Sequence, residues 1–119
     1  MNKVKVIIKE PSREPRIAEI ETDLGSLLDI INGEHIYYVP FPTLEDDGIE
    51  IIQNDDAELL NFDKNIKMPN SSGFIAGTII VCRFDKQSNA QSLTDEQISK
   101  ATKYLKANCL ERKQEAEAA

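Results

Sequence analysis

The sequence predicts a single α+β domain, in which a mostly antiparallel sheet packs against two helices, one after the second strand and one near the C-terminus. Short β-forming segments recur along the chain between turns rich in Pro, Gly and Asn, and only two segments place apolar residues at helical spacing. The length of 119 residues suffices for one hydrophobic core. We expect the domain to span residues 1–110, and the tail, residues 111–119, to fray because it has no apolar side chain larger than Ala.

Short apolar alternations predict the first two strands. Val4, Val6 and Ile8 alternate with lysines, which predicts a strand over residues 3–8. A second short strand is predicted over residues 16–21.

The first helix is predicted to follow Thr22, a good N-cap residue. Its apolar residues fall at positions i, i+3, i+4 and i+7 and should form one buried stripe: Leu24, Leu27, Leu28 and Ile31. Asn32-Gly33 is expected to end the helix, because Gly adopts the left-handed conformation without penalty.

The middle of the chain predicts strands joined by acidic turns. Residues 34–39 are rich in β-formers and predict a third strand. Residues 49–53 and 57–62 flank Asn54-Asp55-Asp56, which predicts a hairpin with this turn at its tip. Residues 63–73 have no clear period and predict a long surface loop, a feature that is often functional in a small domain.

The C-terminal third contains the most apolar strand and the second helix. Residues 74–84 predict one central strand, in which Gly77 indicates a bulge or close packing against a helix. A capping box of Thr94 and Gln97 predicts the helix start. The buried stripe of this helix is expected to contain Ile98, Ala101 and Leu105, with Cys109 as a further candidate.

Charge is distributed unevenly along the chain. It has 14 Lys and Arg against 21 Asp and Glu, a formal net charge of −7, yet residues 17–63 contain 13 acids and no Lys or Arg. We therefore expect an acidic face and a mildly basic face. Direct nucleic-acid binding through the acidic face is disfavoured, because that binding depends on Lys and Arg releasing counterions.

The acidic run suits a protein partner with a basic surface. The predicted contact residues come from two acidic clusters and one aromatic side chain: Glu45, Asp46, Asp47, Asp55, Asp56, Glu58 and Tyr37. Strand alternation puts Tyr37 and Tyr38 on opposite faces, so one should belong to the core and the other be free to anchor a partner. An acidic surface that only keeps the protein soluble is the alternative interpretation.

We expect a soluble, cytoplasmic protein with reduced cysteines. The longest apolar run, residues 75–82, is far shorter than the ~20 residues of a membrane helix, and no apolar secretion segment follows the N-terminus. Cys82 and Cys109 allow at most one disulfide, and Cys82 lies in the apolar run.

No recognisable set of catalytic residues is present, and we expect no enzyme, no metal and no cofactor. His35 is the single histidine, so any catalytic dyad or triad depends on it, yet it begins a predicted strand beside Glu34. His35, Cys82 and Cys109 come from three separate segments, unlike the closely spaced ligands of zinc sites. The two acidic clusters lack the spacing of an EF-hand calcium loop.

A small-ligand site is the second hypothesis for function. The small polar residues Asn70, Ser71, Ser72 and Gly73 would bind the phosphate of a nucleotide through backbone amides, with Lys67 or Arg83 adding charge. This cluster lacks the Lys of a P-loop and precedes a strand rather than a helix.

The order of several motifs resembles a bacterial and phage family, domain of unknown function 3846. The motifs are the strand ending at Pro11, Val39-Pro40, Asn54-Asp55, Met68-Pro69-Asn70, residues 75–78 (Ile-Ala-Gly-Thr) and above all residues 92–98 (Ser-Leu-Thr-Asp-Glu-Gln-Ile), and the resemblance covers about residues 3–105. The chain departs from the family where Gly and a basic residue usually follow the Asn-acid turn, and where Arg usually follows Pro-Asn. Ala57, Glu58 and Ser71 stand there, which puts any shared anion site in doubt.

The resemblance implies no catalytic residues but implies a setting. Such proteins are frequent on phages, plasmids and other mobile elements, where small acidic proteins often inhibit host defence nucleases. We therefore expect a non-catalytic interaction protein of a mobile element, with an anti-CRISPR or anti-restriction inhibitor as its leading form. A module that binds or sequesters a small ligand or nucleotide is the alternative.

Overall fold

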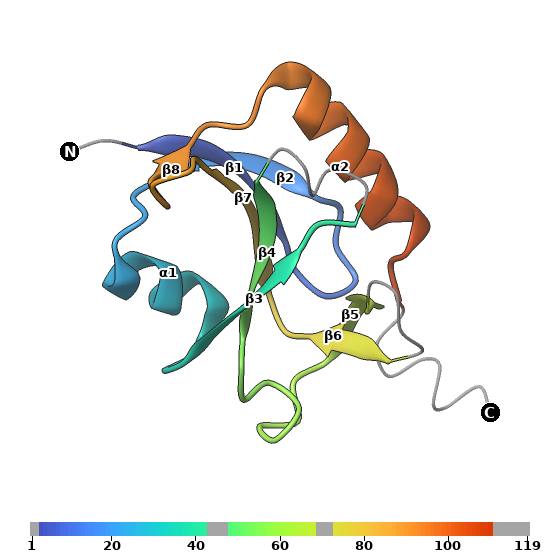
Figure 1. The fold of residues 1–119 in the computed structure, drawn as a ribbon. Helices are drawn as coiled ribbons and strands as arrows, with labels where there is room; N and C mark the ends of the chain where they lie inside the picture. Colours follow the sequence, from blue (N-terminus) through green and yellow to red (C-terminus); the bar gives the residue numbers. More distant parts are fainter. Residues whose placement is uncertain (1–2, 43–47, 69–72, 111–119) are drawn as a thin grey trace.

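The central element is a six-stranded sheet that the chain builds from both of its halves (Figure 1). The computed structural model describes residues 3–42, 48–68 and 73–110. The main path of the sheet runs β2 (Arg16–Ile20), β1 (Val4–Lys9), β7 (Ile79–Phe84), β4 (Ile49–Asn54) and β3 (Ile36–Pro40), with β8 (Ala90–Gln91) paired to β7. A second sheet contains β5 (Lys64–Lys67) and β6 (Phe74–Ala76). All strand pairs among the described residues are antiparallel, which confirms the predicted α+β class.

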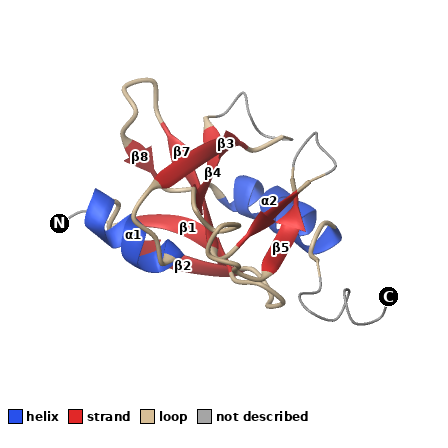
Figure 2. Cartoon of the chain, turned by 90° about the horizontal axis from the view of Figure 1, so that it is seen from below, coloured by secondary structure: helices blue, strands red, loops and turns tan. Residues whose placement is uncertain are grey.

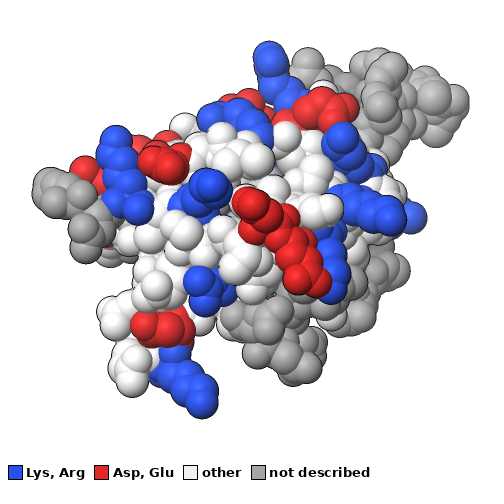
Figure 3. Space-filling model, turned by 90° about the horizontal axis from the view of Figure 1, so that it is seen from above, with Lys and Arg blue, Asp and Glu red and all other residues white. Residues whose placement is uncertain are grey.

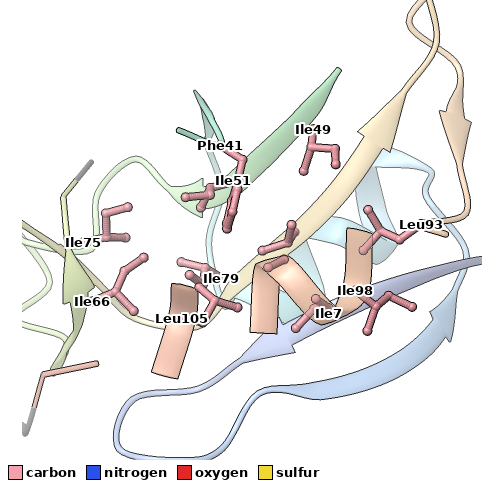
Figure 4. Close-up of a cluster of buried hydrophobic side chains, with 12 residues drawn as sticks. Ile7, Phe41, Ile49, Ile51, Ile66, Ile75, Ile79, Leu93, Ile98 and Leu105 are labelled. Carbon is pink, nitrogen blue, oxygen red and sulfur yellow. The ribbon is translucent and has the colours of Figure 1, made fainter. Parts of the chain in front are cut away.

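Two helices, α1 (Leu24–Ile31) and α2 (Asp95–Ala107), cover opposite faces of the main sheet (Figures 1 and 2). Successive strand residues point to opposite faces, so the central strands must be apolar on both sides. The α1 side buries Val6, Ile8, Ile52, Ile80 and Cys82 with Leu27 and Ile31. The α2 side buries Ile7, Ile49, Ile51, Ile79 and Val81 with Ile98, Ala101 and Leu105 (Figure 4). The predicted central position is confirmed for β7, the C-terminal part of the strand predicted over residues 74–84.

The start of α2 is as predicted, with Thr94 Oγ1 accepting from the Gln97 amide at 3.1 Å and Gln97 Oε1 accepting from the Thr94 amide at 2.9 Å. Cys109 is exposed because the helix ends at Ala107, and Cys82 and Cys109 are both free. Neither helix in the described part of the chain has the length and apolarity needed to span a membrane.

The predicted stop of α1 at Asn32-Gly33 is confirmed, because the helix ends at Ile31, but the predicted N-cap was wrong by one residue. The N-cap is Asp23, not Thr22, and its carboxylate accepts from Ser26, which lowers the pKa of Asp23. At the other end Asn32, not Gly33, takes the left-handed conformation, with φ of 58°. Leu24 is 63% exposed, because the first residue of the helix lies beyond the part that packs on the sheet.

The predicted single strand over residues 74–84 is in fact two strands that belong to different sheets. Gly77 interrupts it with φ of +79°, and a Cβ at this position would lie 2.9 Å from the Phe62 ring. The predicted long loop over residues 63–73 contains β5, the partner of β6. The predicted hairpin is also wrong, since β4 pairs with β3 and β7 and residues 57–62 form a turn.

A buried amide joins the two sheets at this break. Asn65 is fully buried and donates to the carbonyl oxygens of Lys9 at 2.8 Å and Gly77 at 2.7 Å. Its Oδ1 accepts from the ammonium group of Lys9, itself fully buried, at 2.9 Å. Buried polar groups of this kind are tolerated only when they are hydrogen-bonded, so the contact fixes β5 against β1.

Gly77→Ala should test the break between β6 and β7. The variant is expected to lower the free energy of unfolding by about 2 kcal/mol, because it adds a side chain at positive φ and against Phe62. Gly25→Ala is the matched control, since a Cβ there meets only Asp23 Oδ2 at 3.4 Å and should stabilise α1 by about 0.5 kcal/mol. Urea denaturation measures both, and equal stability of Gly77→Ala and wild type would contradict this account.

Candidate functional site

The acidic residues after β4 form a tight, capped turn, which we call the acidic turn (residues 54–62). It projects beyond the sheet between β4 and β5 (Figure 1). Asn54 Oδ1 accepts from the Asp56 amide at 2.9 Å, and the Leu60 amide donates to the Asp56 carbonyl at 2.9 Å. The turn closes through the Phe62 amide, which donates to the Ala57 carbonyl at 3.0 Å.

The residue that reverses the chain at the end of the acidic turn is Asn61. Its φ is 63°, and its amide donates to the Glu58 carbonyl at 3.0 Å. Together with the bond from Phe62 to Ala57, this is the pattern of a Schellman motif, in which an Asn replaces the usual Gly. The acidic turn is therefore a single helical turn with both ends satisfied.

A buried side chain fixes this turn to the rest of the domain. Asn54 is 1% exposed, and its Nδ2 donates to the Asn32 carbonyl at the end of α1 at 3.2 Å. Gly33 packs directly on this amide, since a Cβ there would lie 2.6 Å from Asn54 Cγ. The Asp55 amide also donates to the His35 carbonyl at 3.0 Å, so α1, β3 and the acidic turn meet at one point.

An exposed ion pair supports the same junction. His35 Nδ1 lies 3.0 Å from Asp56 Oδ2. The hydrogen bond with Asp56 and then the Asp56 charge raise the pKa of His35 above its ordinary value of 6.5. The pair links the residue before β3 to the exposed side of the acidic turn.

The acidic turn presents two leucines to solvent. Leu59 is 87% exposed and Leu60 is 54% exposed, whereas Ala57 is buried and Phe62 packs against Gly77. The carboxylates of Glu34, Asp55 and Glu58 are exposed around them. The result is an apolar protrusion within an acidic surface.

The structure places three of the predicted contact residues together, and the surface itself stays a prediction. Asp55, Asp56 and Glu58 lie on the acidic turn, whereas Glu45, Asp46 and Asp47 fall outside the described residues.

The prediction that one of the two tyrosines belongs to the core is wrong, because Tyr37 is 53% exposed and Tyr38 is 46% exposed. β3 is an edge strand, and neither helix covers its two faces at this point. Tyr37 lies opposite Gln53, the residue before the acidic turn.

Leu59 and Leu60 were not among the predicted contact residues, because residues 57–62 were predicted to form a strand. The signal for a helical turn was present: Asn54 precedes two acids and a pair of leucines, and Asn61 follows.

A different part of the surface has a mixed charge pattern. Figure 3 looks onto α2 and the β1–β2 hairpin and shows separate Lys and Arg side chains distributed over that face, with Asp and Glu between them and uncharged residues over much of the surface. The sequence of α2 contains Lys100, Lys103 and Lys106, together with Asp95 and Glu96 in its first turn. This face therefore carries charges of both signs, and the predicted division into an acidic and a mildly basic face stays a prediction.

The predicted phosphate-binding cluster is not assembled by the described residues. Asn70, Ser71 and Ser72 fall outside them, and Gly73 precedes β6. Arg83 lies near the far end of β7 from β6, where its guanidinium donates to the Ser92 carbonyl at 2.9 and 3.1 Å. Arg83 is therefore not placed beside this cluster.

The described residues contain no group of three or more His, Cys, Asp and Glu side chains that could hold a metal ion. The Cys82 thiol is buried, and this burial raises its pKa to about 11. It therefore remains a neutral thiol at physiological pH.

These features define a class: a small antiparallel α+β domain with a helix on each face of its sheet and a capped acidic turn at one end. The chain belongs to the family described as domain of unknown function DUF3846, whose family model matches residues 4–106. The matched region contains the whole of the acidic turn. No curated protein and no solved structure matches the chain.

Asn54→Ala should loosen the acidic turn and the end of α1 together. We expect the free energy of unfolding to fall by about 2 kcal/mol, because the carbonyl of Asn32 and the amide of Asp56 lose their partner. Asn89→Ala is the matched control, since Asn89 is exposed and contributes its backbone amide to the turn at Asp85. Equal denaturation midpoints for the two variants would show that Asn54 does not hold the junction.

The His35–Asp56 pair should stabilise the protein more in acid than in base. A pKa raised in the folded state gives stability that is fully present below pH 6.5, the ordinary value, and is lost as the pH rises through the folded-state pKa. The stability of wild type relative to His35→Gln should therefore decrease with increasing pH across this range. Thermal melts of both proteins over a pH series measure this, and a difference that grows with pH would contradict it.

Proposed function

We propose that this protein is a non-catalytic interaction protein that binds a partner with a basic surface through its acidic turn. The observation that carries the proposal is the exposure of Leu59 and Leu60 on a turn that Asn54 holds in place. Burying a leucine side chain contributes about 1.5–3 kcal/mol, so two adjacent leucines can supply a compact binding hot spot. A preformed turn also loses little conformational entropy on binding.

The surrounding carboxylates give this surface a preferred partner. Exposed Glu34, Asp55 and Glu58 attract a basic surface and repel an acidic one. They act mainly on the rate of association and lose influence as salt screens them. Tyr37 and the acids of the predicted surface outside the described residues, Glu45, Asp46 and Asp47, complete the proposed contact region.

The leading specific form of this proposal is an anti-defence protein of a phage, plasmid or other mobile element, acting in the cytoplasm. A CRISPR or restriction nuclease binds nucleic acid in a basic groove, and an acidic protein with an apolar anchor suits such a groove. The setting implied by the family resemblance supports this choice of partner.

Interference assays test the proposal most economically. Cells with a CRISPR or restriction system should lose protection against phage or plasmid when they express this protein. Leu59→Ala with Leu60→Ala should restore protection and weaken binding to the purified nuclease at least ~10-fold, because the anchor is removed. Leu24→Ala is the matched control, since Leu24 is similarly exposed but lies on α1.

Charge reversal separates the electrostatic contribution to the association rate from the contribution of the leucines to the stability of the complex. Asp55→Lys with Glu58→Lys should slow association, with a larger effect at low salt, and leave the dissociation rate nearly unchanged. Full interference by the double leucine variant, or unchanged protection in every nuclease system, would contradict the proposed function.

A further inference from the structure

A second surface feature lies at the other end of β4 from the acidic turn. It is a cleft of about 400 Å³ on the α1 face of the sheet, lined by Tyr38, Glu50, Phe84 and Ser88. This volume is within the range of small-molecule and side-chain binding sites.

The strand register explains how these residues meet. Glu50 on β4 lies between Pro40 on β3 and Cys82 on β7. On β3, Tyr38 lies opposite Ile52, two residues along from the pair of Pro40 and Glu50. On β7, Phe84 is two residues after Cys82 and therefore points to the same face of the sheet. The two rings meet with centroids 6.0 Å apart at 76°, so an edge-to-face aromatic pair spans the strand that carries Glu50.

The carboxylate in this cleft has no counter-charge within the described part of the chain. Glu50 is half-buried, and the structure gives it no hydrogen bond or ion pair there. The desolvation raises its pKa. The nearest base along β7, Arg83, is committed to the Ser92 carbonyl.

A carboxylate at this position lowers the stability of the fold. Glu50 occupies a place in β4 between Ile49 and Ile51, and its side chain lies on the face that buries Ile52, Ile80 and Cys82. Partial desolvation of an unpaired charge lowers stability. Residues that lower stability in this way are typical of binding sites.

We propose that this cleft binds a guanidinium group. A guanidinium is planar and weakly hydrated, pairs with a carboxylate through two hydrogen bonds, and stacks on aromatic rings. Glu50 supplies the charge, and Tyr38 and Phe84 supply the aromatic surfaces. The cleft is separate from the acidic turn, so this proposal does not depend on the proposed function.

The guanidinium can come from an arginine side chain of a protein or from a free small molecule, and NMR titration distinguishes the two. The probes are ethylguanidinium and a capped Gly-Gly-Arg-Gly-Gly peptide, with the citrulline peptide as the uncharged control. Both charged probes should shift the ring resonances of Tyr38 and Phe84 with Kd values of about 1 mM or below, and the citrulline peptide should not. Tighter binding of the peptide identifies a protein side chain as the source, and equal binding identifies a small molecule; both uphold the site.

Variants assign the binding to the named residues. Glu50→Gln and Tyr38→Ala should each weaken binding at least ~10-fold, whereas Glu19→Gln, which removes an exposed carboxylate on β2, should bind as wild type does. Glu50→Gln should melt no lower than wild type, because it removes an unpaired desolvated charge. The proposal would be overturned if Glu50→Gln melted at a lower temperature than wild type. It would also be overturned if neither charged probe shifted the ring resonances at about 10 mM.

Discussion

Asn54 ends β4 with an amide that is almost completely buried and makes hydrogen bonds in two directions. One bond reaches the carbonyl that ends α1, and the other caps the acidic turn. A buried amide without these partners costs about 1–3 kcal/mol, so the two segments and the sheet are ordered together. The exposed position of Leu59 and Leu60 follows from this constraint, because their turn has its own ends satisfied and is attached to a core strand.

The parts of the fold that depend on local sequence were predictable. A few neighbouring residues encode each of three features: the strand predicted over residues 3–8, the central strand β7 and the capping box at Thr94. The division between β6 and β7 was not predictable in this way. It depends on Phe62 against Gly77 and on Asn65 against Lys9, which are contacts between residues distant in sequence.

The two candidate surfaces differ in how much the sequence revealed of them. The acids of the first were visible in the charge pattern, but the leucines were hidden because residues 57–62 also fit a strand. The second depends on Tyr38, Glu50 and Phe84, which meet only when β3, β4 and β7 pair in their observed register. The two surfaces lie at opposite ends of β4, so one rigid strand fixes their separation.

The proposed binding surface requires that the acidic turn is preformed in the free protein. Backbone order parameters from ¹⁵N relaxation test it directly, since a rigid backbone has values of about 0.85 and a flexible one has values below about 0.6. We expect residues 55–62 to have values close to those of β4 in the protein without a partner. Values below about 0.6 across these residues would contradict it, because the leucines would then have no fixed position to offer a partner.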